Sequence, residues 1–233
     1  MMKKVAIMQP YFFPYIGYWQ AINAVDEYVL YDDVTYIKGG WINRNNILMN
    51  NQPHLITLPI EGASSYKRIN EIYVTKNAKV KEKLCKTISL MYSKAPYYND
   101  VFPIVEKSIM KDGIISEIIY ETVLDICNYI GIKTKIFLSS QLTKNNDLKA
   151  EEKVIDIVKN MGGTIYINAI GGQELYDKEE FKKNGIDLYF IKTNPVEYKQ
   201  FKNEFVPNLS IIDIMMFNSP EKIRELLNEY ELI

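Results

Sequence analysis

Short apolar runs alternate with amphipathic segments along most of the chain, and this alternation predicts an α/β fold. Residues 4–8 (KVAIM) and 27–34 (EYVLYDDV) have the length and composition of strands, and residues 18–25 (YWQAINAV) between them are predicted to form a helix. Two short strands joined by a helix are typical of a βαβ unit, whose strands are parallel.

The same alternation returns in the second half of the chain. Predicted strands at 133–140, 164–169 and 186–192 are separated by predicted helices at 149–161 and 172–184, the second of which ends at Gly185. We therefore expect these segments to extend one parallel sheet, with helices packed against it.

The segment between these halves has a different pattern. Residues 46–49 and 54–60 are predicted to pair as a hairpin around an Asn- and Pro-containing turn, and residues 69–74 are predicted to form a strand. From 77 to 130 apolar residues recur every three or four positions, which is typical of amphipathic helices. The sequence thus predicts a single α/β domain over residues 1–233 with a helical insertion near 77–130.

Two helices are predicted to close the chain, at 210–217 and 219–230. Ser219 has the position of an N-cap, followed by Pro220 in the first turn. Asn208 or Ser210 is expected to cap the first of these two helices, and Asp213 follows Ser210 at the spacing of a capping box, so we expect structural roles for these polar residues.

Charge and hydropathy narrow the class of protein. The chain of 233 residues has 28 basic and 29 acidic side chains and a net charge of −1, which argues against a broad nucleic-acid surface. Its apolar runs are far shorter than the ~20 residues of a membrane span, and its N-terminus lacks the apolar region of a signal peptide. We therefore expect a cytoplasmic protein without a membrane span.

Histidine and cysteine are scarce, and this limits the chemistry. His54 is the one histidine, and Cys85 and Cys127 lie inside predicted helices without metal-binding spacing. Catalytic dyads, triads and zinc sites mostly need these residue types. We expect two buried free thiols and no metal site, so that any catalysis depends on Asp, Glu, Lys, Tyr, Ser or backbone groups.

The stretch MQPYFFPYIGYWQAI (8–22) concentrates aromatic residues directly after the first predicted strand. Ligands of parallel α/β sheets bind at the carboxyl ends of the strands, and the N-terminus of the following helix can hold an anion. The predicted substrate-binding residues here are Gln9, Tyr11, Tyr15, Gly17 and Tyr18. The alternative is a corner of the core, because aromatic clusters are usually buried.

Residues 15–18 (YIGY) resemble the H-x-G-H signature of nucleotidyltransferases and class I aminoacyl-tRNA synthetases, at the matching place after strand one. The resemblance implies a parallel-sheet, nucleotidyltransferase-like (HUP-type) three-layer fold. Tyr15 and Tyr18 stand where those proteins have histidines, and a tyrosine offers a phosphate only a neutral donor. Nucleotide binding is compatible with this exchange, whereas adenylyl transfer by the usual route is not expected.

A second polar segment, YDDVTYIKGGWINRN (31–45), follows the second predicted strand. Asp33 is predicted to act as a base or to hold a sugar hydroxyl, and Lys38 and Arg44 to neutralise phosphates. Asp33 and Lys38 are therefore the candidates for catalysis.

The same segment offers a stacking surface. Trp41 is predicted to stack on a base or a sugar, and Asn43 is a polar substrate-binding candidate beside it. The alternative is a solvated hairpin with ordinary turn residues, in which acids such as Asp32 only cap a strand.

A third candidate corner lies in YINAIGGQELYD (166–177). A predicted strand ends near Asn168, Gly171 and Gly172 turn the chain, and Tyr176 falls on the first turn of a predicted helix. A strand–glycine–helix corner can receive an anion or a carbonyl group, so these four residues are predicted to bind substrate. A plain tight βα turn is the alternative.

Taken together, the motifs resemble the WbqC-like family of bacteria and archaea. The matching stretches, in family order, are MQPYFFPYIGYWQAI, YDDVTYIKGGWINRN, YSKAPYY, SSQLT, YINAIGGQELYD and NLSIIDIMMFN. The resemblance implies a role in surface polysaccharide biosynthesis, such as that of O-antigen, and a ligand related to nucleotide-activated sugars. It does not imply a catalytic residue.

These observations lead to two main hypotheses. The first is a transferase that acts on a nucleotide-activated (amino) sugar, with acyl or aminoacyl transfer to the sugar amine as one form. The second is a non-catalytic module that binds a nucleotide or nucleotide sugar and derives from a nucleotidyltransferase-like fold. The third hypothesis is an interaction protein whose aromatic loop belongs to the core. The sequence leaves open whether the protein needs Mg²⁺ and whether it forms a homo-oligomer.

Overall fold

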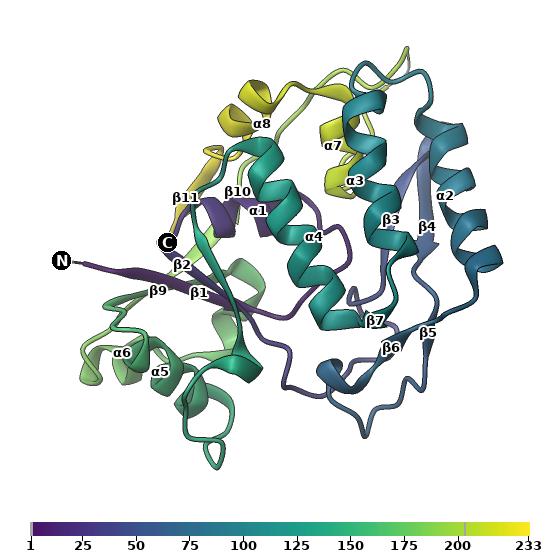
Figure 1. Ribbon diagram of the computed structural model, residues 1–233. Coiled ribbons are helices and arrows are strands. Elements are labelled where there is room, and N and C mark those ends of the chain that lie inside the picture. Colours follow the sequence, from purple (N-terminus) through teal and green to yellow (C-terminus); the bar gives the residue numbers. More distant parts are fainter. Residues whose placement is uncertain (1, 203) are drawn as a thin grey trace.

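The centre of the computed structural model, which describes residues 2–202 and 204–233, is a six-stranded sheet (Figure 1). Its strands lie in the order β11-β10-β9-β1-β2-β8, and all neighbours are parallel except β11, which is antiparallel to β10. Their bounds are Lys4–Met8 (β1), Glu27–Leu30 (β2), Lys135–Leu138 (β8), Ile165–Ala169 (β9), Asp187–Thr193 (β10) and Tyr230–Leu232 (β11). The predicted α/β fold with a mostly parallel sheet is confirmed.

Helices cover both faces of this sheet (Figure 1). On one face lie α1 (Ile16–Asn23) and α4 (Ile115–Ile130), and on the other lie α5 (Ala150–Asn160) and α6 (Lys178–Lys183). A hydrophobic core lies on each face of the sheet, and successive residues of a strand point into different cores. Ala6 and Tyr28 belong to the larger core, and Val5 and Val29 belong to the smaller one.

The larger core extends beyond the sheet and includes side chains from the elements that the middle of the chain forms (Figure 1). Here β3 (Arg44–Met49) and β4 (Gln52–Thr57) form the predicted hairpin, and both turn residues, Asn50 and Asn51, have positive φ, at 50° and 63°. The helices α2 (Ala78–Tyr92), α3 (Tyr98–Met110) and α4 confirm the helical pattern predicted for 77–130.

The remaining elements are short. A small sheet pairs β5 (Ile60–Glu61), β6 (Tyr73–Val74) and β7 (Gly113–Ile114), and the chain ends with α7 (Ile211–Phe217) and α8 (Pro220–Leu226) before β11. As predicted, Ser219 caps α8 by accepting a hydrogen bond from Lys222 N–H (3.2 Å). No helix among the described residues is long and apolar enough to cross a membrane.

Three predicted elements differ from the structure. The segment 69–74 begins with a 3₁₀ turn, Ile69–Glu71, and only its last two residues form a strand. The helix predicted at 172–184 is divided into a 3₁₀ segment (Ile170–Leu175) and α6, because Asp177 interrupts it and caps α6 through Glu179 N–H (2.9 Å). The end of the helix predicted at 219–230 instead forms β11, which pairs with β10.

A buried lysine connects α2 to the end of α3. The side chain of Lys81 is 1% exposed, and its Nζ donates to the carbonyls of Met110 (3.2 Å) and Lys111 (2.7 Å) and to Asp112 Oδ1 (2.6 Å). These are carbonyls that the last turn of a helix leaves without a partner, so the ammonium takes the place of a cap.

Replacement of this lysine tests the cap. We expect Lys81→Met to lower the free energy of unfolding by about 2 kcal/mol, because it fills a similar volume but leaves the half-buried carbonyls of Met110 and Lys111 without this donor. Urea denaturation measures the change, and Lys83→Met, at an exposed position of the same helix, is the control with an expected change within about 0.5 kcal/mol. Equal effects of the two substitutions would contradict the role of Lys81.

Candidate functional site

The order of the parallel strands determines where a ligand can bind. In chain order the five parallel strands are β1, β2, β8, β9 and β10, so their spatial order is 3-2-1-4-5, that of doubly wound sheets. The order reverses between β1 and β9, and ligands of such sheets bind outside the carboxyl ends of the strands at that switch point. Gln9 follows β1 there, and Gly171 follows β9.

The two candidate corners from the sequence therefore meet at the switch point. A Cβ added to Gly171 would have no neighbour within 4 Å, so space is open above this residue. Gln9 continues the alternation of Val5 and Ile7, which face the smaller core, and so lies on the α5/α6 side of the edge. Gln9 and the glycine pair, which the sequence offered as separate candidates, thus follow neighbouring strands at one edge of the sheet.

The position of the Asn168 side chain requires a glycine at residue 172. Asn168 is 8% exposed, and its Oδ1 accepts a hydrogen bond from Ala169 N–H (2.8 Å). A Cβ on Gly172 would lie 2.5 Å from Asn168 Nδ2, so only glycine leaves room for this amide. Tyr176 instead packs edge-on against Tyr166 and Phe181 at centroid distances of 5.9 and 5.7 Å, which makes it chiefly part of the smaller core.

Asp33 is engaged by two lysines that follow β8. Its side chain is 5% exposed, and its Oδ2 lies 3.1 Å from Lys144 Nζ and 3.2 Å from Lys153 Nζ. The lysine side chains are themselves only 2% and 11% exposed, and Lys153 Nζ lies 5.6 Å from the centre of the Tyr31 ring. Burial alone would raise the pKa of Asp33, but the hydrogen bonds of Ser139 and Lys144 and the charges of Lys144 and Lys153 lower it below its ordinary value.

This ion-pair cluster changes the interpretation of both catalytic candidates. Asp33 is a buried carboxylate whose Oδ2 is paired with both lysines, so in this arrangement it is not an exposed base that faces a cavity. Lys38 is exposed on the turn that follows, and no ion pair joins it to another described residue. Asp32 is also engaged, because it accepts hydrogen bonds from Ser140 N–H (2.9 Å) and Ser140 Oγ (2.7 Å).

The aromatic loop is divided between core and surface. Phe12, Phe13, Tyr18 and Trp19 are each at most 1% exposed, so the core-corner alternative is right for them. Tyr18 donates its hydroxyl to the Gln9 carbonyl (2.9 Å) and therefore fixes the loop from inside. Its predicted contact with a ligand is corrected to this supporting role, because a fully buried side chain reaches no ligand.

Tyr15 turns outward, and Gly17 makes room for it. Tyr15 is 38% exposed, and its ring folds back along the start of α1. A Cβ on Gly17 would lie 2.6 Å from Tyr15 Oη and 2.7 Å from Thr193 Oγ1. Gly17 thus permits the approach of Tyr15 to the end of β10, and close approach of a ligand to its backbone is not what requires glycine here.

Tyr15 helps to line a small open cavity, which we call the aromatic hollow. It has a volume of about 310 Å³ and is lined by Tyr11, Pro14, Tyr15, Trp41, Asn45 and Asn208. Two contacts fix its walls: Phe12 N–H donates to the Trp41 carbonyl (3.3 Å), and Asn45 Nδ2 donates to the Phe13 carbonyl (2.8 Å). Trp41 is 46% exposed, so its ring is available for stacking as predicted from the sequence.

The other two candidates of this segment lie elsewhere. Asn43 is buried, accepts a hydrogen bond from Tyr36 Oη (3.0 Å) and donates to the Leu58 carbonyl (3.0 Å), so its predicted substrate contact is corrected to a structural one. Arg44 donates its Nε to the Gly40 carbonyl (3.0 Å) and does not line the hollow. The structure therefore does not bring Lys38 and Arg44 together with Trp41 in one cavity.

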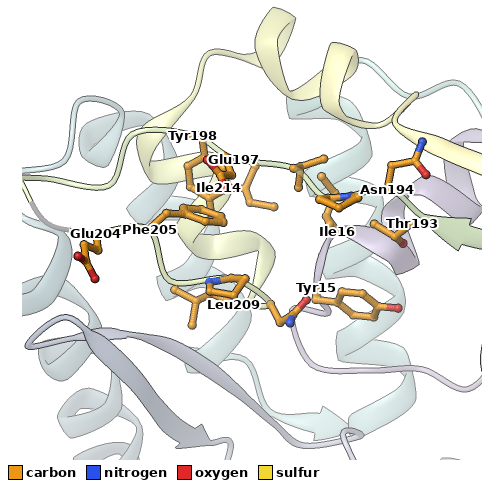
Figure 2. Close-up of a pocket in the computed structure, with 14 residues that line it drawn as sticks. Tyr15, Ile16, Thr193, Asn194, Glu197, Tyr198, Glu204, Phe205, Leu209 and Ile214 are labelled. Atoms are coloured by element: carbon orange, nitrogen blue, oxygen red, sulfur yellow. The ribbon is translucent and has the colours of Figure 1, made fainter.

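A larger cavity adjoins the hollow and shares Tyr15 and Asn208 with it. Its volume is about 650 Å³, and most of its wall comes from the described residues of the connection between β10 and α7, 194–202 and 204–209, which we call the strap (Figure 2). Figure 2 shows Phe205 and Leu209 on one side of this strap cavity and Tyr15 and Ile16 on the other. No motif in the sequence pointed to it except the unusual length of the segment itself.

A buried carboxylate fixes the strap. Asp213 accepts hydrogen bonds from Tyr92 Oη (2.8 Å), Tyr198 Oη (2.7 Å) and Gln200 Nε2 (2.7 Å) and is fully buried. Burial raises the pKa of Asp213, while the three donated hydrogen bonds oppose that change. Ser210 caps α7 as predicted, but Asp213 is this buried acceptor and not a capping-box residue.

Comparison with known proteins identifies the family. The profile of the WbqC-like protein family matches residues 9–225. The chain belongs to the WbqC-like protein family. A protein of Mycobacterium tuberculosis (strain ATCC 25618 / H37Rv) described as "Uncharacterized protein Rv1507c" is 27% identical over 218 residues, which cover 92% of this chain and 93% of that protein.

No solved structure matches this WbqC-like chain. Within residues 2–202 and 204–233, no three His, Cys, Asp or Glu side chains lie together in a way that would hold a metal ion. The candidate site comprises the switch point between β1 and β9, the aromatic hollow and the strap cavity.

A double-mutant cycle tests the contact between Gly17 and Tyr15. Gly17→Ala should displace the Tyr15 ring and lower stability, whereas the same substitution in a Tyr15→Ala background should cost less, because the ring is already gone. We expect a coupling free energy of about 1 kcal/mol from thermal unfolding. Gly171→Ala, where an added Cβ meets nothing, is the control, and strict additivity of Gly17 and Tyr15 would show that they do not compete for space.

The pH dependence of stability tests the ion pairs of Asp33. Because the pKa of Asp33 is lowered in the folded state, its contribution is present above its unfolded pKa of about 3.9 and is lost as pH falls through the folded value. Asp33→Asn should therefore cost about 3 kcal/mol near pH 7, and this difference from the wild type should shrink below about pH 4. Asp187→Asn, at an exposed strand start, is the control; a difference that stays constant with pH would rule out the ionised pair.

Proposed function

We propose that this WbqC-like protein is a transferase that acts on a nucleotide-activated (amino) sugar in surface polysaccharide biosynthesis. The observation that carries the proposal is the aromatic hollow of Tyr11, Tyr15 and Trp41, formed by the loops that leave β1 and β2. A cavity with aromatic walls and two amides at the carboxyl edge of a parallel sheet suits a base or a sugar ring.

The proposed ligand lies with its base or sugar against Trp41 and its phosphates toward the switch point. Gln9 supplies an amide there, and Gly171 leaves backbone space open. The 3-2-1-4-5 strand order and the YIGY turn at the start of α1 support the finer assignment to a nucleotidyltransferase-like (HUP-type) fold. That assignment is part of the proposal.

One observation favours the second candidate, a binding module without catalysis. Asp33 is neutralised by Lys144 and Lys153, Lys38 lies outside the cavities, and Tyr18 is buried where an H-x-G-H protein has a histidine. The residues proposed for chemistry are therefore not assembled around the hollow. Both candidates predict nucleotide binding, and only the first predicts turnover.

Substitution of Trp41 tests the ligand. We expect UDP-N-acetylglucosamine or a related nucleotide sugar to raise the melting temperature of the wild-type protein, since a ligand that binds only the folded state stabilises it. Trp41→Ala should weaken binding about tenfold or more by loss of stacking, measured by calorimetric titration. Trp41→Phe should retain part of the affinity.

Tyr66→Ala is the matched control, because Tyr66 is 97% exposed and lines neither cavity. If no nucleotide or nucleotide sugar raises the melting temperature at saturating concentration, both candidates fail. If ligands bind but no product forms with or without Mg²⁺ in the presence of amine and acyl co-substrates, the binding module is the better description.

A further inference from the structure

The strap is unusually long for a connection inside a compact domain. Among its described residues, 194–202 and 204–209, there is no helix or strand, although it joins β10 to α7. Irregular connections longer than about 12–15 residues are uncommon and are usually functional. The strap also leaves from the carboxyl edge of the sheet, where ligands of this architecture bind.

Internal hydrogen bonds give the strap a defined shape. Gln200 bridges the strap to itself, because its Oε1 accepts from Val206 N–H (2.8 Å) and its Nε2 donates to the Val206 carbonyl (3.1 Å). Tyr198 and Gln200 both donate to Asp213 on α7. The ring of Tyr198 also packs edge-on against that of Phe205, with 5.0 Å between the ring centroids. This contact stabilises the wall of the cavity.

The lining of the strap cavity combines an apolar floor with an acidic rim. Ile16, Leu209 and Ile214 form the floor, and aromatic rings of Tyr15, Tyr198 and Phe205 stand on its sides (Figure 2). Glu197 and Glu204 are the charged side chains of the lining, both are exposed, and neither forms an ion pair with a described residue. The described residues that line the cavity include no lysine, arginine or histidine.

This composition selects the charge of a ligand. A phosphate or carboxylate near either glutamate would meet a like charge, whereas an ammonium group would be attracted by a glutamate carboxylate and by the faces of the aromatic rings. The volume of about 650 Å³ lies in the range of small-molecule sites and exceeds what a single ammonium ion needs. An aromatic ring also packs well against the apolar face of a sugar.

We propose that the strap cavity binds an amine-bearing ligand of sugar size, with its ammonium group toward Glu197 and Glu204 and its ring against Tyr198 and Phe205. This inference rests on the proposed function in one respect: the ligand is the amine-bearing partner of the nucleotide bound in the aromatic hollow. Tyr15 and Asn208, which line both cavities, form the boundary between the two ligands.

An NMR titration with three sugars tests the cavity. Glucosamine, glucose and N-acetylglucosamine are added separately to the ¹⁵N-labelled full chain at a pH where the glucosamine amine is protonated. Glucosamine should shift the amide signals of Asn194, Val196 and Asn208 in a saturable way and should bind about fivefold more tightly than glucose. The preference should weaken at high salt, because exposed charges are screened.

The double substitution Glu197→Gln/Glu204→Gln should remove the preference for glucosamine. Glu82→Gln/Glu106→Gln changes the net charge equally at exposed positions of α2 and α3 and should leave the preference intact. Equal affinity for glucosamine and glucose, retention of the preference in the first double variant, or shifts confined to other surfaces would each overturn the proposal.

The same variants separate this inference from the proposed function. Glu197→Gln/Glu204→Gln should keep the rise in melting temperature that a nucleotide sugar causes, because neither glutamate lines the aromatic hollow. A normal nucleotide response without glucosamine binding would remove only the strap-cavity proposal. Glucosamine binding without any nucleotide response would remove the proposed function and leave the amine site.

Discussion

The hydrogen bonds to the buried carboxylate of Asp213 are the interaction on which the position of the strap, and with it the wall of the strap cavity, depends. This carboxylate lies on α7, accepts hydrogen bonds from Tyr92 of α2 and from Tyr198 and Gln200 of the strap, and has no contact with water. Tyr92 in turn accepts a hydrogen bond from Leu48 N–H in β3 (2.9 Å). A buried carboxylate is tolerated only when protein donors replace the water molecules that it has lost. The four segments that supply or receive these hydrogen bonds, which are α7, α2, the strap and β3, must therefore stay together.

The sheet contributes the second constraint, because parallel strands release their connections at a common edge. The loops after β1 and β2 turn toward the larger core and form the hollow, while the loops after β8 and β9 lead to α5 and α6. The lysine pair on Asp33 lies on this second side. The candidate residues are therefore divided between two sides of one edge, with Gln9 on the side of α5 and α6.

The local sequence pattern was sufficient to predict most of the helices and strands, but it predicted only part of the candidate site. Hydrophobic periodicity and caps such as Ser219 predict elements because each depends on neighbours in sequence. The same pattern does not distinguish Tyr15 from Tyr18, since burial of one and exposure of the other depend on how the loop lies against Gly17 and Thr193. Lys153 and Asp33 are separated by 120 positions, so no local spacing could reveal their contact. β11 was missed for the same reason: it is a strand because β10 is beside it.

The position of Tyr15 has a thermodynamic consequence. Its ring forms part of the wall of the aromatic hollow and part of the wall of the strap cavity. Any ligand that fixes or moves this ring in one cavity changes the affinity of the other cavity, and linkage requires that the effect be reciprocal and equal in free energy. The two cavities are thus coupled binding sites. Their ligands strengthen each other's binding if both prefer the same orientation of Tyr15, and they weaken it if they prefer different orientations.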